Sequence, residues 1–226
     1  MVMNDSMKSK TASGAQDARV APRRPQAETV VKGGPMNAEQ VLNRLMEGNK
    51  RYMEGELGQK DVKGKRESSL QGQKPFATVV ACSDSRVEPV YVFDCNIEEL
   101  FCIQTAGNIL DDIARETIEY AVAHLHTPVV MILGHSRCGA VTAVYQGAAQ
   151  KELPSIAAKI EPAISNVERT GDEDKDVVNC ATANAKAVMK ELMGKSEIVR
   201  NAVEKGETKL VGAMYHLEDG RVDVLQ

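Results

Sequence analysis

Two stretches of the sequence decide the fold: PFATVVACSDSRV at residues 75–87 and PVVMILGHSRCGAV at residues 128–141. Each begins with an apolar run rich in β-branched residues and then turns polar. Such runs are typical of strands that are buried on both faces of a parallel sheet. We therefore predict one strand over Phe76–Ala81 and another over residues 129–134, each ending in a polar loop.

The sequence around these strands alternates between strand and helix patterns. A third apolar run, ELFCIQTAGN, occupies residues 99–108, and residues 111–125 have the spacing of an amphipathic helix. Residues 155–204 are mainly helical. KLVGAMYHL (209–217) and RVDVL (221–225) flank an Asp-Gly turn, which predicts a terminal hairpin. This order predicts an α/β fold, with a single domain in which helices flank a small, mainly parallel sheet.

Several details of these helices and connections are also predicted. Asn37 is a suitable N-cap for a helix that runs to about Glu54. This helix has no obvious strand partner in its own chain, so we expect it to pack on a second subunit. The polar stretch over residues 58–73 is expected to be a connection. Ile113 is expected on the apolar side of its helix, and Pro162 is expected to interrupt the later helical region.

Composition separates an N-terminal tail from the folded part and excludes some classes of protein. Residues 1–35 lack any apolar period and predict a disordered extension, so the domain is expected over residues 36–226. A net charge of −4 argues against nucleic-acid binding. No apolar run is long enough to span a membrane. Five cysteines, an odd number without framework spacing, indicate reduced thiols and a cytoplasmic protein.

Polar residues follow the two deciding strands at the point where each ends. Cys82 follows the first strand, and His135 and Cys138 follow the second. Because parallel strands open at the same edge of a sheet, these side chains should converge. Two thiols and an imidazole favour Zn²⁺, one ion per chain, with the fourth coordination position open. Asp84 and Arg86 should form an ion pair beside it, although Asp84 could instead be a fourth ligand in a closed state.

The motifs ACSDSRV, AGN (106–108) and GHSRCGAV together resemble those of the β-class carbonic anhydrases, over roughly residues 37–226. The resemblance implies that Cys82, His135 and Cys138 bind zinc and that Asp84 and Arg86 form a catalytic dyad. It also implies a homodimer or a higher even-numbered homo-oligomer, with each active site near the subunit interface.

The same resemblance implies a pocket for CO2 and bicarbonate. Val87 is expected to line its apolar part. Gly107 and Asn108 are further candidates, although they could simply shape a turn. Some members of the family carry a Trp and an Arg where this chain has Val79 and Gln104, and those groups bind an inhibitory bicarbonate. That allosteric site is therefore expected to be absent here.

The predicted function is reversible hydration of CO2 by attack of zinc-bound hydroxide. Two alternatives remain open from the sequence. The same zinc scaffold suits a hydrolase of carbonyl sulfide or carbon disulfide, which are linear like CO2. A non-catalytic zinc-binding protein is the other, although a structural zinc site normally has four protein ligands and needs no dyad.

Overall fold

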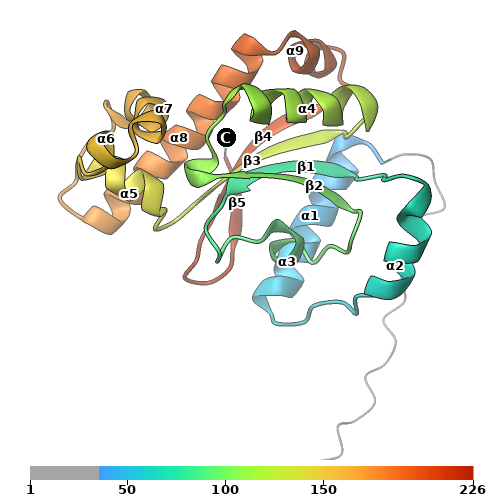
Figure 1. Ribbon diagram of the computed structural model, residues 1–226. Helices are drawn as coiled ribbons and strands as arrows, with labels where there is room; N and C mark the ends of the chain where they lie inside the picture. Colours follow the sequence, from blue (N-terminus) through green and yellow to red (C-terminus); the bar gives the residue numbers. More distant parts are fainter. Residues whose placement is uncertain (1–35, 226) are drawn as a thin grey trace, which may run out of the picture. The chain divides into compact units, whose positions relative to one another are not determined.

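A computed structural model describes residues 36–225, and the extension predicted for residues 1–35 lies outside the described residues. The strands form one sheet in the order β2-β1-β3-β4-β5 (Figure 1). Their bounds are β1 Ala77–Cys82, β2 Leu100–Thr105, β3 Val129–His135, β4 Lys209–Tyr215 and β5 Val222–Val224. The first four strands are parallel and β5 is antiparallel to β4. The predicted α/β fold with a mainly parallel sheet is confirmed.

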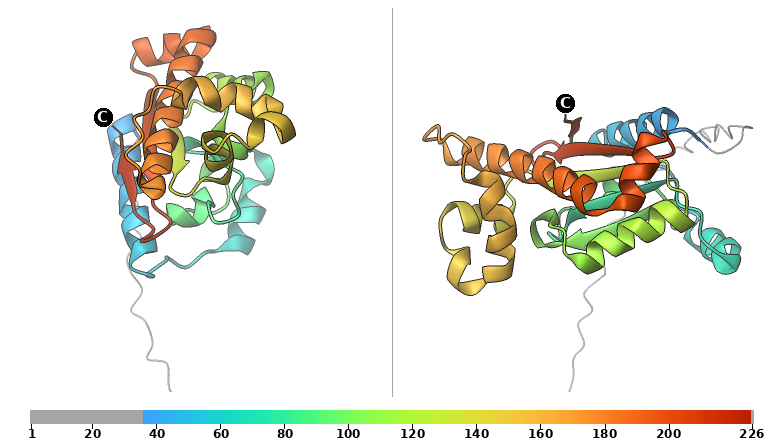
Figure 2. Two further views of the ribbon diagram at one scale, coloured as in Figure 1. Left: turned by 90° about the vertical axis from the view of Figure 1, so that its left-hand side faces the viewer. Right: turned by 90° about the horizontal axis from the view of Figure 1, so that it is seen from above.

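Helices cover both faces of this sheet, as the apolar character of its central strands requires. Alternate residues point to opposite faces, so Val79 and Met131 pack in one core cluster and Val80 and Ile132 in another. On the first face lie α1 Ala38–Met53 and α3 Pro89–Val92. On the second face lie α4 Asp112–His124, α8 Glu173–Lys195 and α9 Glu197–Glu204 (Figures 1 and 2).

The remaining helices lie beside the sheet or in its connections. They are α2 Val62–Ser68, α5 Gly139–Tyr145, α6 Ala149–Glu152 and α7 Pro154–Ile164. Helices α5 and α7 pack with part of α8 in a third core cluster, which also contains Cys82 and Cys138. This cluster places a helical layer directly beyond the carboxyl ends of β1 and β3.

The N-terminal helix packs on the sheet of its own chain, so the premise that it lacks a partner there is wrong, while its packing on a second subunit stays a prediction. Asn37 and Gln40 form a capping box at its start. Val41 and Leu45 are fully buried in the core cluster of the first sheet face, against β1, β3 and β4. The spacing of these two residues in the sequence predicts an apolar helix face but does not indicate which surface covers it. In the structure, the sheet of the same chain covers this face.

Three smaller predictions are also corrected. The stretch 58–73 contains α2, whose N-cap Asp61 accepts a hydrogen bond from the Gly64 amide. Pro162 lies inside α7 without ending it: its missing N–H costs one backbone hydrogen bond of the last turn, and the helix still continues to Ile164. Ile113 is 72% exposed, since it lies on a different side of α4 from the buried Ala114 and Ile118.

The predicted C-terminal hairpin is confirmed. Strands β4 and β5 pair antiparallel, and the His216 amide donates to the Arg221 carbonyl across the turn. Gly220 has φ +79°, a conformation that few residues other than glycine adopt easily. The turn brings residues 217–219 to the same end of the sheet as the polar loops that follow β1 and β3. Among the helices of residues 36–225, none is both long and apolar enough to cross a membrane.

Candidate metal centre

The sheet brings together the side chains that the sequence places at the ends of two strands. Strands β1 and β3 are parallel neighbours with Ala81 opposite Leu133. Cys82 and His135 therefore end their strands at the same edge. Cys138 lies one short turn beyond His135, at the N-cap of α5.

The donor atoms of Cys82, His135 and Cys138 lie within 4.8 Å of one another. The two sulfur atoms are 3.9 Å apart and are not joined in a disulfide. All three side chains are buried. The predicted convergence of two thiols and an imidazole is thus present in the structure, and these groups could hold a metal ion.

The imidazole of His135 is oriented as a metal ligand. Its Nδ1 lies 2.8 Å from the Ser136 carbonyl oxygen, to which it donates as N–H. This contact leaves the lone pair on Nε2, which is buried and has no hydrogen-bond partner among the described residues. A buried acceptor without a partner is costly, and a metal ion at Nε2 would satisfy it. The donor set and this orphaned nitrogen both fit a bound Zn²⁺.

The environment of the two sulfur atoms favours a thiolate. Hydrogen bonding with Cys138 lowers the pKa of Cys82, and the Gly107 amide, whose nitrogen is 3.2 Å from the sulfur, acts in the same direction. The same sulfur–sulfur contact and burial raise the pKa of Cys138. The contact therefore favours the thiolate at Cys82 and the thiol at Cys138, and a divalent cation bound to both would displace the remaining proton.

Asp84 and Arg86 form the predicted ion pair beside the thiols. Arg86 donates from Nε to Oδ1 at 2.9 Å and from Nη2 to Oδ2 at 2.7 Å, and its backbone amide donates to Oδ1 at 3.0 Å. These bonds lower the pKa of Asp84 to about 2, so the carboxylate is ionised at neutral pH. Arg86 Nη2 also lies 3.4 Å from the Arg137 carbonyl oxygen. The guanidinium therefore connects the loop after β1 to the loop after β3.

The three predicted pocket residues differ in their relation to this centre. Gly107 touches it directly through its amide and Cys82. Asn108 is buried, and its Nδ2 has no hydrogen-bond partner within residues 36–225. Val87 is 1% exposed and packs in the core cluster of the first sheet face, which is not the cluster that contains Cys82 and Cys138.

Two residues near the centre were not identified from the sequence. Glu218, in the terminal hairpin, accepts hydrogen bonds from Ser136 Oγ and Arg137 Nε, both at 2.8 Å. Asn184, on α8, donates to the Gly107 carbonyl oxygen at 2.8 Å. Each is far along the chain from the residue it contacts. A local signal for Asn184 was its position among the apolar residues Ala181, Ala185 and Val188 of the same helix.

A parallel sheet with two thiols and an imidazole at its carboxyl edge defines an α/β protein with a candidate metal site. A family model described as carbonic anhydrase matches residues 77–222. A carbonic anhydrase of Mycolicibacterium smegmatis is 33% identical over 186 residues, which are 80% of this chain and 89% of the relative. The chain belongs to the carbonic anhydrase family, and the fold is that of its β class.

Solved structures agree with this assignment. The β-carbonic anhydrase CcaA matches with a TM-score of 0.64 at 25% identity, over 82% of this chain and 95% of the other. A structure from a study of two tetrameric β-carbonic anhydrases of Sordaria macrospora matches with a TM-score of 0.62 at 21% identity, over 82% and 96%. The second likeness is one of fold.

Proposed function

We propose that the protein is a zinc enzyme that catalyses the reversible hydration of CO2 to bicarbonate and a proton. One observation carries this proposal: the three buried donor atoms of Cys82, His135 and Cys138 lie within 4.8 Å of one another beside an ion-paired Asp84. A zinc ion held there would acidify water and so supply a hydroxide nucleophile near neutral pH.

In this proposal Asp84 selects and orients what enters the site. Both carboxylate oxygens are held by Arg86, and as an ionised group Asp84 can only accept hydrogen bonds. It would therefore orient a ligand that carries an O–H and repel anions that have no proton to donate. The carboxylate is not part of the compact group of donor atoms. We infer that the open arrangement, and not the state with Asp84 as a fourth ligand, is the one that turns over.

The substrate side of the site is proposed from the remaining loop residues. Gly107 contacts the Cys82 sulfur from the segment that follows β2, and Asn108 is the next residue of that segment. The unpartnered Nδ2 of Asn108 is a donor that bicarbonate oxygens could accept from. Val87 remains a proposed pocket residue. Because it is buried in the core cluster of the first sheet face, it would contribute to the pocket by packing beneath the loop that follows β1.

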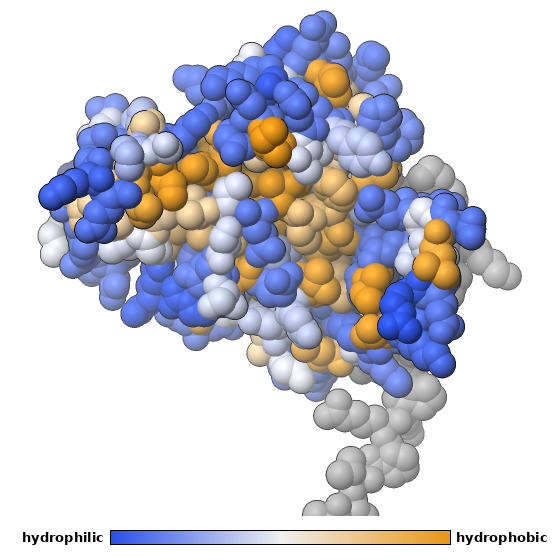
Figure 3. Space-filling view, viewed as in Figure 1, coloured by the Kyte–Doolittle hydropathy of each residue, from blue (hydrophilic) through white to orange (hydrophobic). Residues whose placement is uncertain are grey.

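We further propose a homodimer or a higher even-numbered oligomer. Strand β2 is an edge strand with several half-buried apolar residues. Figure 3 shows apolar side chains gathered over this part of the molecule, between α4 and α2. An edge strand with an apolar surface usually needs a cover. Light scattering on the purified protein, with an even multiple of 24.5 kDa as the expected mass, tests this proposal.

The proposed compartment is the cytoplasm. All five cysteines are free thiols in the structure, as is usual in a reducing environment. Labelling of thiols in intact and lysed cells of the source organism would test this assignment, since only lysis should expose the protein to an impermeant reagent.

The central experiment is stopped-flow CO2 hydration with protein of known zinc content, from about pH 6.5 to 9, around the neutral pKa that zinc gives to water. Activity proportional to zinc content, lost on chelation and restored by Zn²⁺, is expected. Asp84→Asn should keep the metal and lose most activity. Sulfide release from carbonyl sulfide without CO2 hydration, or one zinc per chain with no turnover at all, would overturn the proposal.

A further inference from the structure

Asn184 is a buried polar side chain in the helix that packs beside the metal centre. It is 1% exposed and lies on α8 between Ala181 and Ala185, which are also buried. A polar amide in such surroundings is costly unless it is hydrogen bonded. Its Nδ2 donates to the Gly107 carbonyl oxygen at 2.8 Å, across 77 residues of sequence.

Gly107 connects this amide to a metal-ligand candidate. While its carbonyl accepts from Asn184, its own N–H points at the sulfur of Cys82, 3.2 Å away. The two polar groups flank one Cα, whose φ of +72° is in the left-handed region. Without a side chain, this residue could adopt many other conformations. The hydrogen bond from Asn184 therefore helps to select the one in which the N–H reaches the sulfur.

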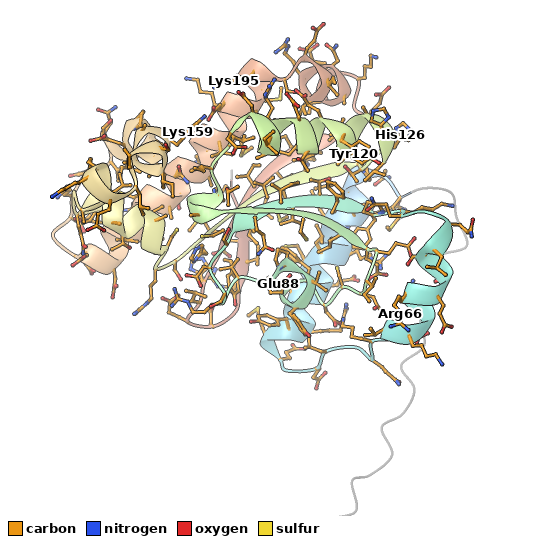
Figure 4. All side chains as sticks on the ribbon, in the orientation of Figure 1. Arg66, Glu88, Tyr120, His126, Lys159 and Lys195 are labelled. Carbon is orange, nitrogen blue, oxygen red and sulfur yellow. The ribbon has the colours of Figure 1, made fainter. Side chains whose placement is uncertain are left out.

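The surroundings of Gly107 are rigid enough to transmit this constraint. A Cβ at this position would lie 2.8 Å from Ile160 Cδ1, so α7 packs tightly against the glycine. Helix α7 is in turn tied to α8 by Lys159 (Figure 4), which donates to Glu191 Oε1 at 2.8 Å. The glycine is thus enclosed between two joined helices.

We propose that Asn184 is a positioning residue for Cys82: it fixes Gly107 so that the glycine N–H donates to the ligand sulfur. Such a hydrogen bond stabilises the thiolate and reduces the charge that it donates to a bound metal. Asn184 thereby sets metal affinity and the electronic character of the metal–sulfur bond from a helix that contributes no ligand. This inference rests on the proposed metal site.

The test is Asn184→Leu, which has a similar shape and no donor. The matched control is Val188→Ala, on the same helix and in the core cluster of the second sheet face, away from Gly107. Zinc affinity is measured by competition with a chromophoric chelator, and the thiolate-to-metal charge-transfer band by cobalt substitution. We expect Asn184→Leu to bind zinc about 10-fold more weakly and to shift the band. Val188→Ala should lower the melting temperature and change neither.

The outcomes separate this inference from the function on which it rests. If the wild-type chain binds neither zinc nor cobalt, the proposed function fails. If it binds both and Asn184→Leu matches it in affinity and spectrum, only the positioning role is refuted. Should Asn184→Leu not fold, Asn184→Ala takes its place in the same comparison. In the wild-type protein loaded with ¹¹³Cd, scalar coupling from the metal to the Gly107 amide proton is expected, and its absence would also refute the proposal.

Discussion

The most informative single substitution outside the metal centre is Glu218→Ala. Glu218 lies in the terminal hairpin, yet its two carboxylate oxygens bind the loop that carries His135 and Cys138. Ser136 Oγ donates to one oxygen and itself accepts from the Leu217 amide at 2.9 Å. The substitution removes an acceptor from this loop while leaving every donor of the metal centre in the chain.

The magnitude follows from the burial of the two donors. Ser136 is 1% exposed, and a buried hydroxyl left without its acceptor costs about 1–3 kcal/mol. The Arg137 and Glu218 side chains are 56% and 49% exposed, so their ion pair contributes at most about 1 kcal/mol. We expect a loss of about 2 kcal/mol in the free energy of unfolding. For a domain of this size, that loss lowers the melting temperature by about 4–8 °C.

Urea denaturation at one protein concentration measures this loss. Zinc competition measures the effect of Glu218→Ala on the loop that carries His135 and Cys138. Asp219→Ala is the matched control, because Asp219 is the next residue and, within residues 36–225, its side chain bonds only to Arg221. Its expected cost is within about 0.5 kcal/mol. Arg137→Ala separates the ion pair from the serine contact and should cost about 1 kcal/mol or less. If Glu218→Ala behaves like Asp219→Ala, or if Arg137→Ala costs as much as Glu218→Ala, the reasoning is refuted.

Three further predictions concern other parts of the chain. Burial raises the pKa of Asp94, but hydrogen bonds, chiefly from Lys60, outweigh it and leave that pKa lowered. Asp94→Asn should therefore lower the free energy of unfolding by about 2 kcal/mol at pH 7. The resulting difference in urea midpoint should persist above about pH 4 and disappear as the pH falls through the native pKa of Asp94. Equal midpoints at pH 7 would contradict it. Gly107→Ala should lower the free energy of unfolding by at least about 1 kcal/mol, because the residue has φ +72° and its new methyl group would meet Ile160. Thermal unfolding measures this loss, and an unchanged melting temperature would show that the site tolerates a side chain. Cys138→Ser should lose zinc and activity together, and elemental analysis showing one zinc per chain would remove Cys138 from the ligand set.

The strands and the convergence of the candidate metal ligands could be predicted from the sequence because their signals are local. An apolar run that ends in Cys82 or His135 shows both the strand and the side chain at its end. The packing of α1 on its own sheet could not be read in this way, since Val41 and Leu45 show only that some apolar surface covers them.

The residues that support the loop after β3 could not be predicted from the sequence, for a related reason. Ser136 and Glu218 are 82 residues apart in the sequence, and no pattern in either segment indicates the other. Their contact depends on the β3–β4 register, in which His135 lies opposite Tyr215. Such a register follows from the packing of the whole sheet and is not encoded within either segment.

The place of Glu218 in the chain also determines when the loop that carries His135 and Cys138 can become rigid during synthesis. A ribosome makes Cys82 first, then His135 and Cys138, and only much later the carboxylate that braces Ser136. At about 5–20 residues per second, the 82 intervening residues require roughly 4–16 s. During that interval the nascent chain carries Cys82, His135 and Cys138 but lacks the carboxylate that braces Ser136. The loop that carries His135 and Cys138 therefore reaches its described geometry late in the synthesis of each chain, after a hairpin that contributes none of the three donor atoms.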